Sequence, residues 1–445
     1  MTLIQLFQFI LSISILVILH ELGHFIPAKY FKTKVEKFYL FFDPWFSIVK
    51  KKIGDTEYGI GWLPFGGYVK IAGMVDESMD TEQLKKPAEP WEFRSKPAWQ
   101  RLIIMLGGVT VNFFLAWFIY SSLSYFKGES FHDNSKFENG VAVSDAGKKM
   151  GLQPGDKILK IDGKPAERME TSTINMLFAN EATVLRDGKE VTFPINEDGV
   201  AEVLAQSEAK AYFGPRFPAV IDSLLPNGTA KAAGLIKGDK IVGINGKPVQ
   251  YFDQLSDELS KFKNQNISLD IERNNTPQKI EVKVDDKGKL GFSTDTDVAQ
   301  KEFEKTQVTK NYSLLEAIPR GFQRTIDVLT MQVKQFKIVF NSKTQGYKKV
   351  SGPIGIIKQM PETINWEFFW SFTAMFSVWL AFLNLIPIPG LDGGHVMFTL
   401  WEIITGKPVP QKVLEHAQMI GVIFLLGLMV LIFGNDIVKW ITGKF

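Results

Sequence analysis

The sequence predicts a polytopic α-helical membrane protein with four spans, a membrane-associated β-hairpin region and a duplicated β-rich region between spans two and three. Three observations support this fold class. Four long apolar runs are nearly free of charge, and each is long enough to cross about 30 Å of hydrocarbon. Most charged residues of the 445-residue chain lie between these runs. Two segments of the charged middle region also align with each other without gaps.

The predicted spans differ in how continuous they are. The first covers residues 1–28, where Glu21 is the only formally charged side chain. The second covers 101–126 and the fourth 417–437, and both runs lack the polar face of a buried soluble helix. The third segment, 367–402, contains prolines and glycines that interrupt a helix.

Lysines indicate the orientation, because short cytoplasmic loops are enriched in Lys and Arg. Four lysines at positions 29–37 and the triplet 50–52 follow span one, and Lys407 and Lys412 separate spans three and four. We therefore expect the first and third connections in the cytoplasm, with both termini and the middle region outside. Lys439 and Lys444 argue weakly for the opposite orientation.

The cytoplasmic connection, 29–100, contains an apolar, glycine-rich stretch at about 58–73, with turn residues at Pro64, Gly66 and Gly67. This composition predicts a β-hairpin that dips into the membrane. Non-helical backbone at that depth must be buried in protein or line a wet cavity. A hairpin on the protein surface is the alternative. Residues 76–96 have the composition of a solvated loop.

The middle region contains an internal repeat, because residues 151–165 align with residues 234–248. The shared Gly-Asp pair, the alternating apolar residues and the closing Asp/Asn-Gly turn are typical of a strand that enters a tight hairpin. The pattern resembles the PDZ domain, and we expect modules at 127–212 and 213–298. Such modules bind extended peptides and C-terminal carboxylates. Spacers with unused grooves are the alternative.

Residues 299–366 are predicted to be a linker that contains an amphipathic helix at about 314–340. Its apolar stripe suits either the membrane surface or a contact with the PDZ modules, and the sequence does not decide between them.

Composition excludes several classes of function. The chain has no cysteine, so it has no disulfide, no Cys-ligated zinc and no thiol nucleophile. A net charge of +3, with no basic stripe interleaved with aromatic residues, argues against nucleic-acid binding.

The motif H-E-x-x-H lies inside the first span, at residues 20–24. On a helix His20 and His24 share one face, at the spacing that suits two imidazole ligands of one zinc ion. Glu21 lies beside them, where it can accept a proton from a water molecule activated by the metal. Ionisable groups within a membrane span mark functional sites.

A catalytic zinc site needs a third protein ligand. His132 lies outside the membrane in the expected topology, and His416 lies in a cytoplasmic connection. The third segment offers both Asp392 and His395. Chemistry alone leaves both possible, and the cost of an uncompensated carboxylate at that depth favours Asp392.

Three features together resemble the site-2 protease family of intramembrane zinc metalloproteases. They are L-H-E-L-G-H in the first span, N-x-x-P-x-P-x-L-D-G-G in the third, and the PDZ modules between spans two and three. The resemblance implies that His20, His24 and Asp392 hold Zn²⁺, with Glu21 as the general base. The family's Gly-Pro-x-x-Asn in span two lacks its proline here but keeps Asn112.

The resemblance also implies an endopeptidase that cuts single-span membrane proteins, such as pre-cleaved anti-sigma factors and signal-peptide remnants. It would act in a bacterial plasma (inner) membrane, in contact with the lipid bilayer, with its active site toward the cytoplasm. We expect Asn384, Asn112, Gly66 and Gly67 to position substrate backbone. The alternative is a membrane-anchored PDZ scaffold with a degenerate site.

Overall fold

The computed structural model describes residues 2–64, 66–74, 87–205, 211–339, 341, 343 and 350–442, without the side chains of Thr296 and Lys337. The chain divides into two compact units. The helical unit comprises residues 1–128, 311–333 and 350–445, and the middle unit comprises residues 129–310 and 334–349.

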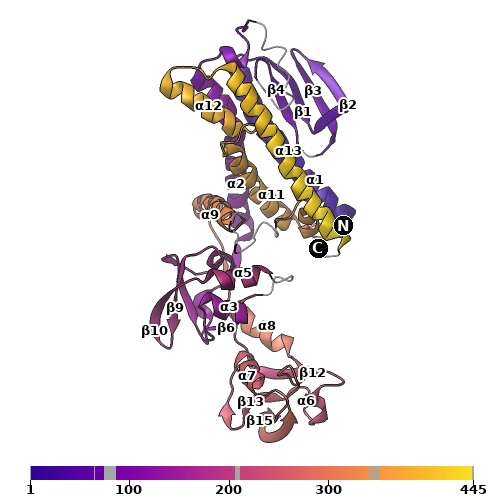
Figure 1. Cartoon of the computed structure of the whole chain (residues 1–445), viewed down its shortest axis with the longest axis vertical. Coiled ribbons are helices and arrows are strands. Elements are labelled where there is room, and N and C mark those ends of the chain that lie inside the picture. The colour runs from indigo at the N-terminus through magenta and orange to yellow at the C-terminus, as the bar shows by residue number, and fades with distance from the viewer. Residues whose placement is uncertain are drawn as a thin grey trace. The chain divides into compact units, whose positions relative to one another are not determined.

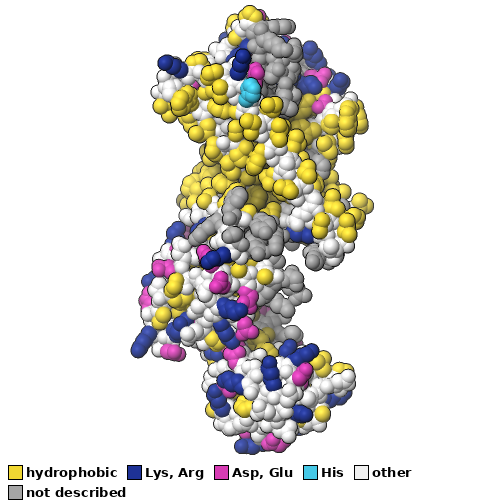
Figure 2. Space-filling model, viewed as in Figure 1, with side chains coloured by type: hydrophobic (Ala, Val, Ile, Leu, Met, Phe, Trp, Pro, Cys, Tyr) yellow, Lys and Arg dark blue, Asp and Glu magenta, His cyan; other side chains and the backbone are white. Residues whose placement is uncertain are grey.

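Among its described residues, the helical unit contains four helices that are long and apolar enough to cross a membrane (Figure 1). They are α1 (Leu3–Tyr30), α2 (Ala98–Lys127), α11 (Trp366–Leu385) and α13 (Gln411–Ile441). Hydrophobic side chains crowd the surface over these helices, whereas charged side chains are spread over the middle unit (Figure 2). The four predicted spans and the β-rich region between the second and third are confirmed.

Small polar side chains join these helices inside the bundle. The hydroxyl groups of Ser12 on α1 and Thr373 on α11 lie 2.9 Å apart, and all of both residues' surface is buried. Ser377 Oγ on α11 donates to the backbone oxygen of Asn112 on α2 at 2.7 Å. Apolar surroundings give helices little reason to associate, so hydrogen bonds of this kind and close packing hold the bundle together.

The third segment is interrupted, as its prolines and glycines predict, and forms two helices. Helix α11 ends at Leu385, and α12 (Asp392–Thr405) begins after a short irregular stretch. Pro387 and Pro389 cannot donate a backbone hydrogen bond, and Gly390 has a φ of 101° that other residues rarely adopt. The break places Asp392 at the first position of a new helix.

A four-stranded sheet follows α1 and packs against it (Figure 1). Its strands are β1 (Val35–Leu40), β2 (Phe42–Ile53), β3 (Thr56–Leu63) and β4 (Tyr68–Ile71), in the order β2-β3-β1-β4. The prediction of a hairpin within 58–73 is therefore wrong in its pairing, because β1 lies between β3 and β4. Strand β1 pairs in parallel with β3 and antiparallel with β4, an arrangement that no local turn signal reveals. Phe65, and residues 75–86 of the predicted loop, lie outside the described residues. The end of that loop holds a short 3-10 helix at Phe93–Ser95.

The middle unit contains two similar modules, each with its own apolar core. The first comprises β5 (Glu129–His132), a 3-10 helix (Asn134–Lys136), β6 (Val141–Val143), α3 (Asp145–Met150), β7 (Lys157–Ile161), β8 (Lys164–Pro165), α4 (Met169–Met176), β9 (Glu181–Arg186), β10 (Lys189–Pro194), α5 (Glu197–Ala205) and β11 (Phe213–Pro215). The second comprises β12 (Ala219–Leu224), α6 (Thr229–Ala232), β13 (Lys240–Ile244), β14 (Lys247–Pro248), α7 (Phe252–Leu259), a 3-10 helix (Ser260–Phe262), β15 (Asn266–Arg273), β16 (Thr276–Lys283) and β17 (Phe292–Thr294). Helix α8 (Thr296–Lys305) and β18 (Gln307–Lys310) follow.

Strand pairing moves the boundary of the first module. Strand β11 lies beyond the predicted end at residue 212, yet it pairs with β6. Strand β18, in the predicted linker, pairs with β5. Both pairings join residues far apart in sequence, which a local repeat does not reveal.

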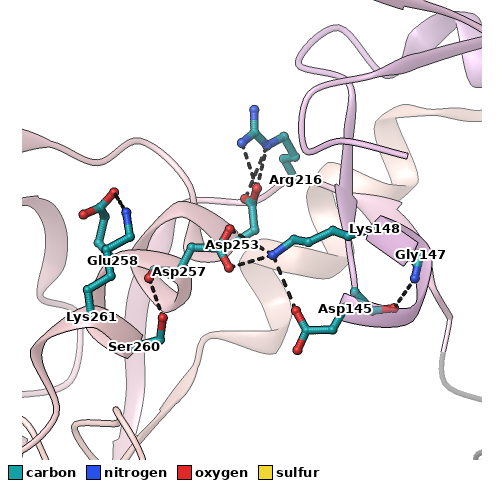
Figure 3. A network of polar contacts seen from close by, with 10 residues as sticks. Asp145, Gly147, Lys148, Arg216, Asp253, Asp257, Glu258, Ser260 and Lys261 are labelled. Carbon is teal, nitrogen blue, oxygen red and sulfur yellow. Dashed lines mark hydrogen bonds and ion pairs between the residues drawn. The ribbon is translucent and has the colours of Figure 1, made fainter. Parts of the chain in front are cut away.

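Salt bridges connect the two modules (Figure 3). Lys148 Nζ on α3 lies 2.8 Å from Asp257 Oδ1 on α7. Arg216, which follows β11, lies 2.7 Å from Asp253 Oδ2 at the start of α7. These contacts link α7 of the second module to residues of the first.

Helix α9 (Leu314–Val339) is the predicted amphipathic helix, and residue 340 lies outside the described residues. Its first part packs along α2: Trp117 Nε1 donates to the Ile318 backbone oxygen at 2.9 Å, and Phe322 contacts Phe113 and Trp117. Its last residues belong to the middle unit, where Ile338 joins the first module's core. Contact with span two was not foreseen.

Candidate metal centre

His20 and His24 lie one turn apart on the same face of α1, as their spacing predicts. Their side chains are 8% and 7% exposed, and their Nε2 atoms are 3.3 Å apart. Two imidazole nitrogens are thus held together within a helix that is otherwise nearly all apolar.

Asp392 completes this group from a distant part of the chain. Its Oδ2 atom lies 3.3 Å from His20 Nε2 and 3.2 Å from His24 Nε2. These atoms form a possible metal-binding group in the part of the chain that the structure describes. The Oδ2 atom is buried, and no hydrogen-bond donor reaches it from the described residues.

The three atoms have the spacing of zinc ligands. Each pair is 3.2–3.3 Å apart. Neighbouring ligands in a tetrahedral site, with zinc bonds of about 2.0–2.1 Å, lie about 3.3–3.4 Å apart. Two imidazoles and one carboxylate are also a ligand set that catalytic zinc uses. The residues therefore fit a zinc ion with one position left open.

The two glycines that follow Asp392 are packed too closely against backbone for larger residues. A Cβ atom on Gly393 would lie 2.2 Å from the Ile386 backbone oxygen, and one on Gly394 would lie 2.8 Å from the Ile388 oxygen. The Gly390 amide donates to Gln418 Oε1 of α13 at 3.1 Å. The Leu-Asp-Gly-Gly motif thus packs tightly against the irregular stretch between α11 and α12, and the hydrogen bond to α13 holds that stretch in place.

The second nitrogen of each imidazole is also engaged. His24 Nδ1 lies 2.8 Å from the Ile104 backbone oxygen, which can only accept, so this nitrogen carries the proton and Nε2 is free for a metal. Asn112 Nδ2 lies 3.0 Å from His20 Nδ1, and Asn384 Nδ2 lies 3.1 Å from His20 Nε2. Both predicted asparagines therefore contact a histidine of the site.

Glycines that the sequence analysis did not select allow α2 to approach the histidines. A Cβ atom on Gly108 would lie 2.3 Å from His24 Nε2 and 2.6 Å from His20 Cε1. One on Gly107 would lie 1.9 Å from the Gly23 backbone oxygen. The Gly-Gly pair within an apolar span was the available signal, because small residues mark close helix contacts.

A cavity of about 810 Å³ opens beside the three ligand atoms. Glu21, Asn384, Gly66 and Gly67 line it, together with strand β4. The structure thus brings the predicted base, the glycines and Asn384 to one cavity.

The remaining histidines take no part in the three-residue group. His395 lines the same cavity. His132, in the middle unit, pairs with Glu170. His416 is exposed and contacts the Lys412 backbone oxygen. Of the two third-ligand candidates, Asp392 is the one whose oxygen meets both imidazoles.

Comparison with known proteins supports the same chemistry. Residues 8–428 match the family model described as "Peptidase family M50". The chain is 28% identical to "Regulator of sigma E protease" of Haemophilus influenzae, over 97% of this chain and 98% of that protein. It is 27% identical to "Regulator of sigma-E protease RseP" of Escherichia coli K12, with 97% and 98% covered. It is 28% identical to a "Putative zinc metalloprotease" of Vibrio cholerae, again with 97% and 98% covered.

The family match spans the histidine pair, the broken third segment and most of the last helix, and the full-length similarity covers the middle unit as well. The chain therefore belongs to peptidase family M50 and is a zinc metalloprotease of the site-2 type.

Proposed function

We propose that this metalloprotease cuts single-span membrane proteins within or beside the bilayer. The observation that carries the proposal is the location of the His20, His24 and Asp392 group. It lies among helices that can cross a membrane and opens to a cavity. A substrate that reaches this cavity must itself enter among membrane helices.

His20, His24 and Asp392 are proposed to hold the zinc ion, which when bound supplies a Lewis acid that polarises the scissile carbonyl and acidifies water. Glu21 accepts the proton of the attacking water and passes it to the nitrogen of the leaving amine. Glu21 suits this role because it lines the cavity and follows His20 on the same helix.

Strand β4 is proposed to hold the substrate in an extended form. It lies at the edge of its sheet and lines the cavity with Glu21. A helical substrate hides its carbonyl groups, so it must unwind, and an edge strand offers main-chain hydrogen bonds to an unwound segment. Gly66, Gly67 and Asn384 line the same cavity and are proposed to position that backbone.

The expected substrates are pre-cleaved anti-sigma factors and signal-peptide remnants. Two similar proteins carry the name regulator of sigma E protease, which supports the first class. The lysine distribution supports a bacterial plasma membrane location with the metal centre toward the cytoplasm and the modules outside. The two modules are proposed to bind extended peptides or to exclude bulky uncut proteins.

Replacing Glu21 by Gln tests this function. The variant keeps all three ligands, so we expect bound zinc with cleavage reduced by about 100- to 10,000-fold. Purified wild type and Glu21→Gln would be incubated with a panel of single-span peptides, and cuts mapped by mass spectrometry. The proposal would be contradicted if Glu21→Gln cut peptides at the wild-type rate. It would also be contradicted if the wild-type protein, loaded with zinc, cut none of the peptides.

A further inference from the structure

The imidazole of His20 lies between two asparagines, one at each ring nitrogen. Asn384, on α11, meets Nε2 at 3.1 Å, and Asn112, on α2, meets Nδ1 at 3.0 Å. Asn384 lines the cavity, whereas Asn112 is fully buried and is not among the residues that line it. The two asparagines therefore have different surroundings, although the sequence analysis treated them alike.

Asn112 has an amide oxygen in an unusual position. Its Oδ1 atom is buried and has no hydrogen-bond partner among the described residues. A buried polar atom left without a partner costs about 1–3 kcal/mol. Among the described residues, the acceptor capacity of Asn112 is therefore unused in the orientation that the amide has in the structure.

Zinc chemistry favours a different orientation of the amide. A metal on His20 Nε2 needs the lone pair of that nitrogen, so the ring proton must lie on Nδ1, which becomes a donor. The amide nitrogen of Asn112 is also a donor and cannot accept from it. Rotating the amide by about 180° exchanges its nitrogen and oxygen within the same volume. Nδ1–H of His20 then donates to Oδ1 of Asn112.

We propose that Asn112 is a positioning residue that holds His20 in the zinc-binding tautomer through its amide oxygen. The proposal rests on the ligand set of the proposed function. His24 offers a parallel, because its Nδ1 already faces a backbone acceptor, the Ile104 oxygen, at 2.8 Å. Each ligand ring thus has one acceptor behind it, and only that of His20 belongs to a side chain.

The test measures zinc affinity by chelator competition for full-length wild type, Asn112→Leu, Asn112→Ala and Asn112→Asp. Groups that hydrogen-bond to a metal-binding histidine contribute about 10- to 100-fold to metal affinity. We therefore expect Asn112→Leu and Asn112→Ala to lose zinc affinity by that factor. The carboxylate in Asn112→Asp offers only acceptor oxygens, so the zinc affinity of this variant should stay within a few fold of that of the wild type. If the amide nitrogen were the functional group, Asn112→Asp would bind zinc as weakly as Asn112→Leu.

Ser377→Ala is the matched control. It removes a buried hydrogen bond at the same residue, between Ser377 Oγ and the Asn112 backbone oxygen, without touching His20. Its zinc affinity should match wild type. The absorption spectrum of Co²⁺-loaded protein provides a second readout, with wild-type bands expected for Asn112→Asp and altered bands for Asn112→Ala.

Each outcome decides one point. Asn112→Ala affinity within twofold of wild type, or Asn112→Asp as weak as Asn112→Ala, overturns the role of Asn112. If Asn112→Leu does not fold, the Ala and Asp variants carry the comparison. A wild type that binds zinc but cuts no peptide overturns the proposed function alone, and one that binds no zinc overturns both.

Discussion

Asp239 in the second module and Asp392 in the helical unit are both largely withdrawn from solvent, with side chains 0% and 19% exposed. Arg273 donates to both Asp239 oxygens, at 2.8 and 2.7 Å, and the Ile236 amide adds a bond of 2.9 Å. Asp392 Oδ2 instead faces two imidazole nitrogens at 3.2–3.3 Å. Asp239 thus has its cation, the Arg273 guanidinium, within the fold. Asp392 instead lies beside two imidazole nitrogens, with which it forms the proposed metal site.

We propose that this difference separates a structural carboxylate from a metal-binding one. The first module repeats the structural arrangement, with Arg186 donating to Asp156 at 2.8 and 2.7 Å. The duplicated Gly-Asp thus closes each module through a bidentate ion pair, which is the strong geometry for arginine and carboxylate. Burial alone does not identify a site, whereas the chemistry of the neighbouring atoms does.

Asp392→Asn should have the largest effect. An amide is a poor zinc ligand, so we expect loss of bound zinc and cleavage at background level, while the fold is kept. Zinc content by atomic emission and peptide cleavage by mass spectrometry provide the measurements. His395→Ala is the control and should keep its zinc. The opposite pattern would make His395 the third ligand.

Asp239→Asn should destabilise the second module by about 1.5–3 kcal/mol, because the buried Asp239 carboxylate loses its charge-assisted hydrogen bonds from Arg273 and the Ile236 amide. Faster hydrogen exchange at β13 and β15 in the full-length protein, followed by mass spectrometry, would report this. Zinc content should not change. Asp156→Asn provides the matched variant in the first module, and unequal effects would show that the two pairs are not equivalent.

The same ion pair makes stability depend on pH. Burial raises the pKa of Asp239. Hydrogen bonds from Arg273 and the Ile236 amide lower it by more than burial raises it, so the pKa lies below the ordinary value. A lowered carboxyl pKa contributes stability that is complete above about 3.9 and is lost as pH falls through the folded pKa. At pH values below about 4, the protection of β13 amides from hydrogen exchange should therefore decrease. The decrease should be smaller in Asp239→Asn.

Asp436→Asn should have an intermediate effect. This fully buried carboxylate of α13 accepts from the backbone amides of Gly352, Ile354 and Gly355 at 2.8–3.2 Å, at the start of α10 (Pro353–Gln359). Losing the charge should cost about 1–3 kcal/mol. Faster exchange at residues 352–359 is the expected result. Asn435→Ala, which removes one neutral bond to the Val350 oxygen, should cost less, and an equal cost would contradict a special role for the charge.

Lys148→Ala should have the smallest effect. The partly exposed Lys148 and Asp257 side chains, 34% and 48% exposed, form a pair between the modules that solvent screens. Such pairs contribute about 0.2–1 kcal/mol. We expect exchange in α7 to change little. A large change there would show that this pair, rather than packing, holds the modules together.

The sequence predicted what depends on local pattern. Nearly uncharged apolar runs marked all four membrane helices, and the apolar setting of His20 and Asp392 made both stand out. It did not predict the order of β1–β4, because β1 enters between two strands through non-local pairing. It also could not separate Asn112 from Asn384, since spacing does not tell which imidazole nitrogen an amide meets.

X-ray absorption at the zinc edge of the purified wild-type protein tests the central claim most directly. The account predicts a single zinc site with two imidazole ligands, and carboxylate or water oxygen as the other ligands, with the oxygen contribution altered in Asp392→Asn. Three imidazoles in the wild type, or a zinc environment that Asp392→Asn leaves unchanged, would contradict the site built from His20, His24 and Asp392.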